Sequence, residues 1–149
     1  MTDLQDLYQE LILDHGRRPR NFGKLADANK TAEGYNPLCG DKIRVYVKVG
    51  GDVVEDIKFE GAGCAISTAS ASIMTDALKG KTRAESEQLF KAFHDLVTGH
   101  QQEAETQDLG KLAVFSGVSE FPTRVKCATL SWHTLRAALS GDGEVVSTE

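Results

Sequence analysis

The stretch KIRVYVKVGGD, residues 42–52, decides the fold class of this chain. Its apolar residues alternate with polar ones and are Ile43, Val45, Val47 and Val49. Strict alternation predicts a half-buried strand, and Gly50-Gly51-Asp52 is typical of a hairpin turn. Residues 54–60, which carry Ile57 and Phe59 on one face, are expected to form the returning strand. The pattern therefore predicts an antiparallel sheet with one face covered.

Helical patterns lie on both sides of this hairpin. Residues 4–12 have apolar positions at helical spacing, and a short third strand, interrupted by Gly34, is expected over residues 30–36. After the hairpin, we expect helices over residues 64–78, from Thr82 onward, over 109–115 and over 125–139. Thr82 and Glu85 have the spacing of a capping box, and residues 99–108 have no apolar period.

The order of these elements indicates an α+β fold. We expect a small antiparallel sheet of about three strands packed with several helices, in one domain spanning residues 1–149. The end of the chain after about residue 141 is expected to be loose. Trp132 and Phe115 are expected in the core.

Composition and charge exclude several classes of function. The chain has 149 residues and a net charge of -5, which argues against a general nucleic-acid binder. It has no apolar run long enough to span a membrane, and its first residues lack the pattern of a signal peptide. We therefore expect a cytoplasmic protein, in which thiols stay reduced. Three cysteines are an odd number for a disulfide framework, so metal or sulfur chemistry is the better interpretation.

All three cysteines lie at predicted boundaries between elements, and an aspartate lies beside one of them. Cys39 and Asp41 flank Gly40 in a tight loop, Cys64 begins a predicted helix, and Cys127 lies in the first turn of the last predicted helix. Helix N-termini favour thiolate over thiol. Three thiolates and a carboxylate predict a tetrahedral metal site, for zinc or an iron–sulfur cluster. The alternative is that Cys64 and Cys127 are small buried core residues.

Three ordered motifs carry a resemblance to a known family: NPLCGD at residues 36–41, GAGCAIS at 61–67 and VKCA at 125–128. With these motifs the sequence resembles the U-type iron–sulfur cluster assembly family, which includes IscU, the N-terminal domain of NifU, and SufU. The resemblance spans roughly residues 4–139. Lys126 stands where the IscU branch has a histidine, and residues 121–126 stand where that branch has a chaperone-recognition segment. The stretch between Cys64 and Cys127 is also longer than in IscU-like proteins. These departures are similar to the SufU branch.

The resemblance implies an IscU/NifU-like fold and a zinc ion held by Cys39, Asp41, Cys64 and Cys127. It also implies a sulfurtransferase-like acceptor of persulfide sulfur from a pyridoxal-phosphate cysteine desulfurase of the SufS type, which the acceptor stimulates. Downstream iron–sulfur assembly proteins would be further partners. In this interpretation Cys39 is the attacking thiolate. A histidine of the desulfurase takes its place on the metal, and Arg124 orients Asp41 or the incoming persulfide.

Two other functions fit the same residues. The first is a scaffold on which a transient iron–sulfur cluster is built and passed on, without turnover of its own. The second is a zinc-stabilised adaptor without chemistry. The four histidines are scattered and are not expected to bind metal: His15, His94, His100 and His133. The basic run of Arg17, Arg18 and Arg20 is either a solvated connector or a docking surface for the desulfurase.

Overall fold

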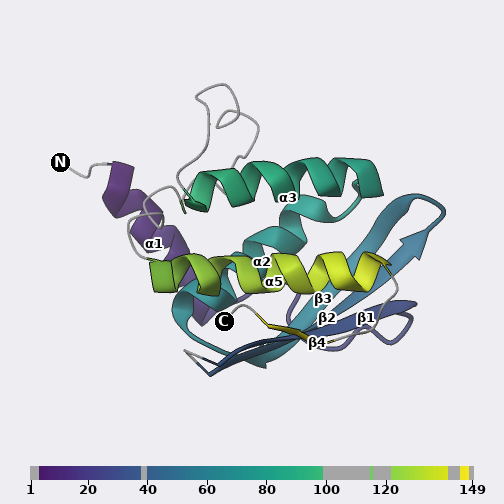
Figure 1. Ribbon diagram of the computed structural model, residues 1–149, viewed down its shortest axis with the longest axis horizontal. Helices are drawn as coiled ribbons and strands as arrows, with labels where there is room; N and C mark the ends of the chain where they lie inside the picture. The colour runs from purple at the N-terminus through teal and green to yellow at the C-terminus, as the bar shows by residue number, and fades with distance from the viewer. Residues whose placement is uncertain (1–3, 38–39, 99–114, 116–121, 141–144, 148–149) are drawn as a thin grey trace.

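The computed structural model describes residues 4–37, 40–98, 115, 122–140 and 145–147. Helix α1 comes first, a hairpin-containing sheet follows, and the remaining helices come after it, as the α+β prediction required (Figure 1). The elements are α1 (Leu4–Arg17), β1 (Lys30–Asn36), β2 (Asp41–Gly50), β3 (Val53–Ala62), α2 (Ala65–Leu78), α3 (Arg83–Thr98), α5 (Pro122–Ser140) and β4 (Val145–Ser147). That residues 1–149 form a single domain stays a prediction.

The sheet has the strand order β3-β2-β1-β4. The three antiparallel strands β1, β2 and β3 are confirmed, with Val45 opposite Ala32 on one side and Phe59 on the other. Strand β4 pairs parallel to β1, so the expectation of a loose tail is wrong for residues 145–147. Gly34 does not interrupt β1. A Cβ atom at this position would collide with Thr134 of α5, so the glycine lets the helix lie close to the strand.

The core lies between one face of the sheet and the helices. Ile43, Val45 and Val47 are buried on that face, as their alternation predicted. Helices α2 and α5 pack against the sheet and against each other, and α3 packs on the outer side of α5 (Figure 1). Phe93 of α3 stacks on Trp132 of α5 with ring centroids 4.7 Å apart, and both Trp132 and Phe115 are fully buried, as predicted. This packing holds the N-terminal turns of α2 and α5 over the same end of the sheet.

Two helix starts compare differently with the sequence predictions. The capping box is confirmed, because Glu85 N–H donates to Thr82 Oγ1 and Thr82 N–H donates to Glu85 Oε1, each at 3.1 Å. Helix α5 begins at Pro122 rather than at residue 125. Cys127 therefore lies in the second turn, and its predicted place in the first turn is wrong. Proline suits the first position of a helix, because that N–H has no intrahelical partner.

The polar segment predicted over residues 99–108 lies outside the described residues, as does the helix predicted over 109–115 apart from Phe115. Among the helices that the structure describes, none combines the length and the apolar character needed to cross a membrane.

Candidate metal centre

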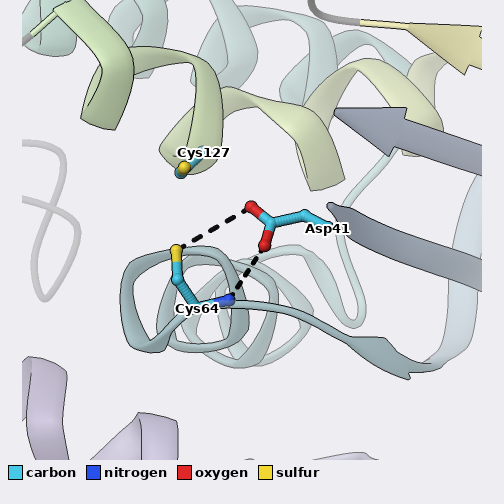
Figure 2. A group of neighbouring side chains, drawn as sticks. All are labelled: Asp41, Cys64 and Cys127. Carbon is cyan, nitrogen blue, oxygen red and sulfur yellow. Dashed lines mark hydrogen bonds between the residues drawn. The ribbon is translucent and has the colours of Figure 1, made fainter. Parts of the chain in front are cut away.

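Three of the four residues predicted to bind metal meet at one end of the sheet. Asp41 comes from the start of β2, Cys64 from the residue before α2, and Cys127 from α5 (Figure 2). One ligand atom from each of them lies within 4.8 Å of the other two. Within the described part of the chain, this is the one group of three or more His, Cys, Asp or Glu side chains with such geometry.

Asp41 is fixed by the backbone of the residue that it faces. Its side chain is buried, and its Oδ1 atom accepts a hydrogen bond from Cys64 N–H at 2.9 Å. The neighbouring Gly63 leaves room for this carboxylate, because a Cβ atom there would lie 2.9 Å from Oδ1. The second oxygen, Oδ2, accepts from the Cys64 thiol at 3.8 Å. The carboxylate therefore already faces the position that a shared cation would take.

Cys64 acts as the N-cap of α2. Its Sγ atom accepts a hydrogen bond from Ser67 N–H at 3.4 Å, and the residue is exposed. The pKa of the Cys64 thiol is lowered to about 6, first because Cys127 hydrogen-bonds to it and then because of the N–H groups of Ser67 and Ile66. Burial and the Asp41 carboxylate act in the opposite direction. The predicted helix-start thiolate is thus confirmed in its placement, and an exposed cap does not fit the alternative of a small core residue.

Cys127 has a different environment from Cys64. It is 3% exposed, and Asn36 Nδ2 donates a hydrogen bond to its sulfur at 3.8 Å. Because Cys127 lies in the second turn of α5, the argument from the helix N-terminus applies less to it than to Cys64. The burial of Cys127 fits a small core residue as well as a metal ligand. Its position facing Asp41 and Cys64 favours the role of a metal ligand.

The spacing of the three donor groups fits a zinc ion. Tetrahedral zinc has bonds of about 2.3 Å to sulfur and 2.0–2.2 Å to oxygen, which separates its ligand atoms by roughly 3.6–3.8 Å. The Cys64 sulfur and Asp41 Oδ2 lie 3.8 Å apart, and all three ligand atoms lie within 4.8 Å of one another. Two sulfurs and one carboxylate oxygen leave one position of a tetrahedron for a fourth ligand. The same donors also suit an iron–sulfur cluster.

The two predicted catalytic residues are placed less fully. Cys39 lies outside the described residues. The next residue, Gly40, has a φ of 71°, which favours glycine, and its N–H donates to the Asn36 carbonyl oxygen at 2.8 Å. Arg124 lies one turn before Cys127 on α5, with an exposed side chain. Its predicted contact with Asp41 or with a persulfide stays a prediction.

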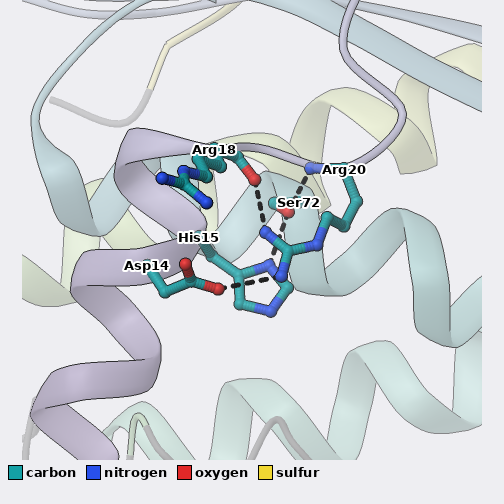
Figure 3. A network of polar contacts seen from close by, with 5 residues as sticks. All are labelled: Asp14, His15, Arg18, Arg20 and Ser72. Atoms are coloured by element: carbon teal, nitrogen blue, oxygen red, sulfur yellow. Dashed lines mark hydrogen bonds and ion pairs between the residues drawn. The ribbon is translucent and has the colours of Figure 1, made fainter.

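The basic connector after α1 is attached to α2, and Ser72 of α2 carries the contacts nearest to its arginines (Figure 3). Arg20 backbone N–H donates to Ser72 Oγ at 2.8 Å, and this oxygen lies 2.6 Å from Nδ1 of the fully buried His15. The Arg20 guanidinium pairs with Asp14 at 2.8 Å and also contacts Arg18 carbonyl oxygen. Arg20 is therefore held in place, which a simple solvated connector does not require. A role of Arg17, Arg18 and Arg20 in docking a desulfurase stays a prediction.

Two residues of the site had no predicted role. Ser67 contributes its N–H group to Cys64, which follows from its position three residues after a helix cap. Asn36 contacts Cys127 across 91 residues of sequence. The only local signal for Asn36 was its position in the NPLCGD motif, next to the predicted ligands.

Comparison with known proteins gives consistent matches over most of the chain. Residues 7–128 match the family model described as the NifU-like N terminal domain. The chain is 46% identical over 139 residues to the zinc-dependent sulfurtransferase SufU of Bacillus subtilis (strain 168), covering 93% of each chain. It is 42% identical over 139 residues to the iron–sulfur cluster assembly scaffold protein IscU of Streptococcus pyogenes serotype M1, covering 93% of this chain and 86% of that protein.

One of the similar solved structures combines the same fold with a related sequence. It is that of a candidate iron–sulfur cluster assembly scaffold protein for the SUF system from Fervidobacterium islandicum AW-1. The TM-score is 0.83 and the identity is 37%, covering 92% of this chain and 99% of that chain.

Proposed function

This chain belongs to the family of the NifU-like N-terminal domain, and from this premise we propose that it is an iron–sulfur cluster assembly protein that accepts sulfur at a zinc centre. Its sulfur donor is a cysteine desulfurase that carries a persulfide, and the sulfur that it accepts passes to downstream assembly proteins. A cytoplasmic location, where thiols stay reduced, is part of the proposal. The observation that carries it is the convergence of Asp41, Cys64 and Cys127 from three separate elements.

Four residues of the chain hold the zinc ion in this proposal: Cys39, Asp41, Cys64 and Cys127. Bound zinc supplies positive charge that keeps coordinated thiols deprotonated and compensates the cluster of anions. Asp41 is oriented by Cys64 N–H, and Cys127 is held inside the fold by α5. These two residues suit a holding role, because both are buried and neither side chain is accessible to a large partner.

The sulfur-accepting step is assigned to Cys39. Its thiolate attacks the terminal sulfur of the desulfurase persulfide, and a new sulfur–sulfur bond forms on Cys39. The sulfur–sulfur bond of the donor breaks, and the donor cysteine leaves as a thiolate. The reaction moves one sulfur atom without an external oxidant or reductant. Arg124, one turn before Cys127 on α5, is placed in the proposal beside the incoming persulfide, where its charge stabilises the anion.

The acceptor assignment is tested with Cys39→Ala and Cys64→Ala. Each variant is incubated with a cysteine desulfurase and cysteine, and mass spectrometry locates the added sulfur atom while elemental analysis measures bound zinc. We expect the wild-type protein to carry the sulfur on Cys39, and Cys39→Ala to lose both this label and stimulation of the desulfurase. The Cys64→Ala variant controls for loss of a ligand. Sulfur found on Cys64 in the wild-type protein, or full stimulation by Cys39→Ala, would overturn the assignment.

The second candidate function is a scaffold for a transient iron–sulfur cluster on the same four residues. It is favoured by the thiolate-rich donor set and by the likeness to IscU scaffolds. Anaerobic reconstitution with iron and sulfide, compared with the zinc content of the protein as purified, separates the two functions. A zinc-stabilised adaptor is favoured instead if zinc removal unfolds the domain and sulfur transfer never occurs.

A further inference from the structure

Asn36 lies at the point where the parts of the metal centre are joined. It is the last residue of β1, it is fully buried, and it pairs with Asp41 across the β1–β2 ladder. Its carbonyl oxygen accepts a hydrogen bond from Gly40 N–H at 2.8 Å, next to the start of β2. Its side-chain Nδ2 donates to the Cys127 sulfur at 3.8 Å.

We propose that Asn36 is the positioning residue of the metal centre and acts on Cys127 through its side-chain amide. The proposal rests on the proposed function, because it assumes that the cysteines bind a metal. Asn36 does not contact the metal itself. Its backbone accepts from Gly40 N–H and pairs with Asp41, while its amide contacts the sulfur of Cys127 on α5.

The amide is suited to this role for electrostatic reasons. Cys127 is 3% exposed, so water cannot readily stabilise its thiolate. A neutral N–H donor stabilises the negative sulfur without adding a charge to a centre that already contains Asp41 and Cys64. Hydrogen bonds from such outer partners orient metal ligands, and their loss typically lowers metal affinity by about 10–100-fold.

A buried asparagine can also be only a part of the core whose hydrogen bonds are satisfied. In that case its loss would destabilise the fold but would leave the electronic properties of a bound metal unchanged. A positioning role predicts more. Without the N–H donor the Cys127 sulfur is more electron-rich, so the sulfur-to-metal charge-transfer band of a cobalt-loaded protein moves to longer wavelength.

The experiment compares Asn36→Leu, which keeps the branched shape of the side chain without its polar atoms, and Asn36→Ala with the wild-type protein. The control is Asn29→Ala, which removes two side-chain hydrogen bonds to Val49, of 2.8 and 2.9 Å, at the opposite end of the same ladder. Cobalt and zinc affinities are measured by competition with a chelator, the cobalt spectrum is recorded, and thermal unfolding is followed without metal.

We expect both Asn36 variants to bind cobalt and zinc about 10–100-fold more weakly and to show the shift of the charge-transfer band. The Asn29→Ala control should lose stability but keep the wild-type metal affinity and spectrum. Unchanged affinity and spectrum in an Asn36 variant would overturn the proposal for Asn36 alone. A wild-type protein that shows no sulfur-to-cobalt band would overturn the proposed function instead.

A measurement on the wild-type protein does not depend on the variants folding. In protein loaded with NMR-active cadmium, the hydrogen bond predicts a scalar coupling between the metal and the Asn36 side-chain amide proton. Absence of this coupling, in a spectrum where couplings through the cysteine ligands are resolved, would contradict the contact in the loaded protein.

Discussion

Substituting Gly63 with alanine tests how the fold orients the Asp41 carboxylate. The new Cβ atom would lie 2.9 Å from Asp41 Oδ1, while Gly63 is not among the glycines with positive φ, so its backbone does not demand glycine. The carboxylate has to turn, and it loses its 2.9 Å hydrogen bond from Cys64 N–H. A hydrogen bond to a charged group contributes about 1.5–3 kcal/mol. At about 1.4 kcal/mol for each factor of ten, zinc affinity should fall roughly 10- to 150-fold.

The assay is a zinc competition titration with a chelator on matched protein preparations. Gly50→Ala is the control, because the atoms that its Cβ would meet belong to the exposed side chain of Glu55, which can move away. We expect the control to bind zinc as tightly as the wild-type protein. Wild-type affinity in Gly63→Ala would refute the reasoning that Asp41 is a ligand oriented by the Cys64 backbone.

Three further predictions concern α2, α3 and the Cys64 thiol. Ser72→Ala should cost about 1–3 kcal/mol of stability, because Arg20 N–H and His15 Nδ1 lose their hydrogen bonds to the Ser72 hydroxyl. The melting temperature should fall by about 2–4 °C for each kcal/mol, and Ser140→Ala, at an exposed residue, is the control. Thr82→Ala should cost about 0.5–2 kcal/mol in denaturant unfolding through loss of the α3 cap, and no loss would contradict the capping box. In metal-free protein, alkylation of Cys64 should accelerate through about pH 6, because its pKa is lowered to about 6, and Cys127→Ala should move this midpoint upward. Since this pKa lies below that of an unfolded thiol, the thiolate's contribution to stability is present above about pH 9 and is lost as the pH falls through about 6. An alkylation midpoint near that of a free cysteine would contradict the lowered pKa.

The antiparallel hairpin and the capping box were predictable because their signals are local. Alternation from Ile43 to Val49 and the glycine turn fix the pairing of β2 with β3 over adjacent residues. Thr82 and Glu85 are three residues apart and satisfy each other. Cys64 was placed correctly for the same reason, because Gly63 follows β3 just before a helical pattern begins.

The features that sequence reasoning missed depend on contacts between distant residues. Strand β4 has three residues, too few to show a period, and it forms by pairing with β1 more than a hundred residues earlier. The predicted start of α5 at residue 125 is three residues too late, because Pro122 begins the helix and proline is favoured at the first helical position. The contact of Asn36 with Cys127 joins the end of β1 to α5, and no local sequence pattern relates these two elements.

The metal content of protein purified without added metal is the most direct test of the central claim, that Asp41, Cys64 and Cys127 hold zinc together with Cys39. Elemental analysis against chain concentration, with X-ray absorption to identify the ligands, should find near-stoichiometric zinc bound by sulfur and oxygen. Cys127→Ala should lose this zinc. Near-stoichiometric iron would favour the cluster scaffold over zinc, and protein that contains neither metal would contradict the account.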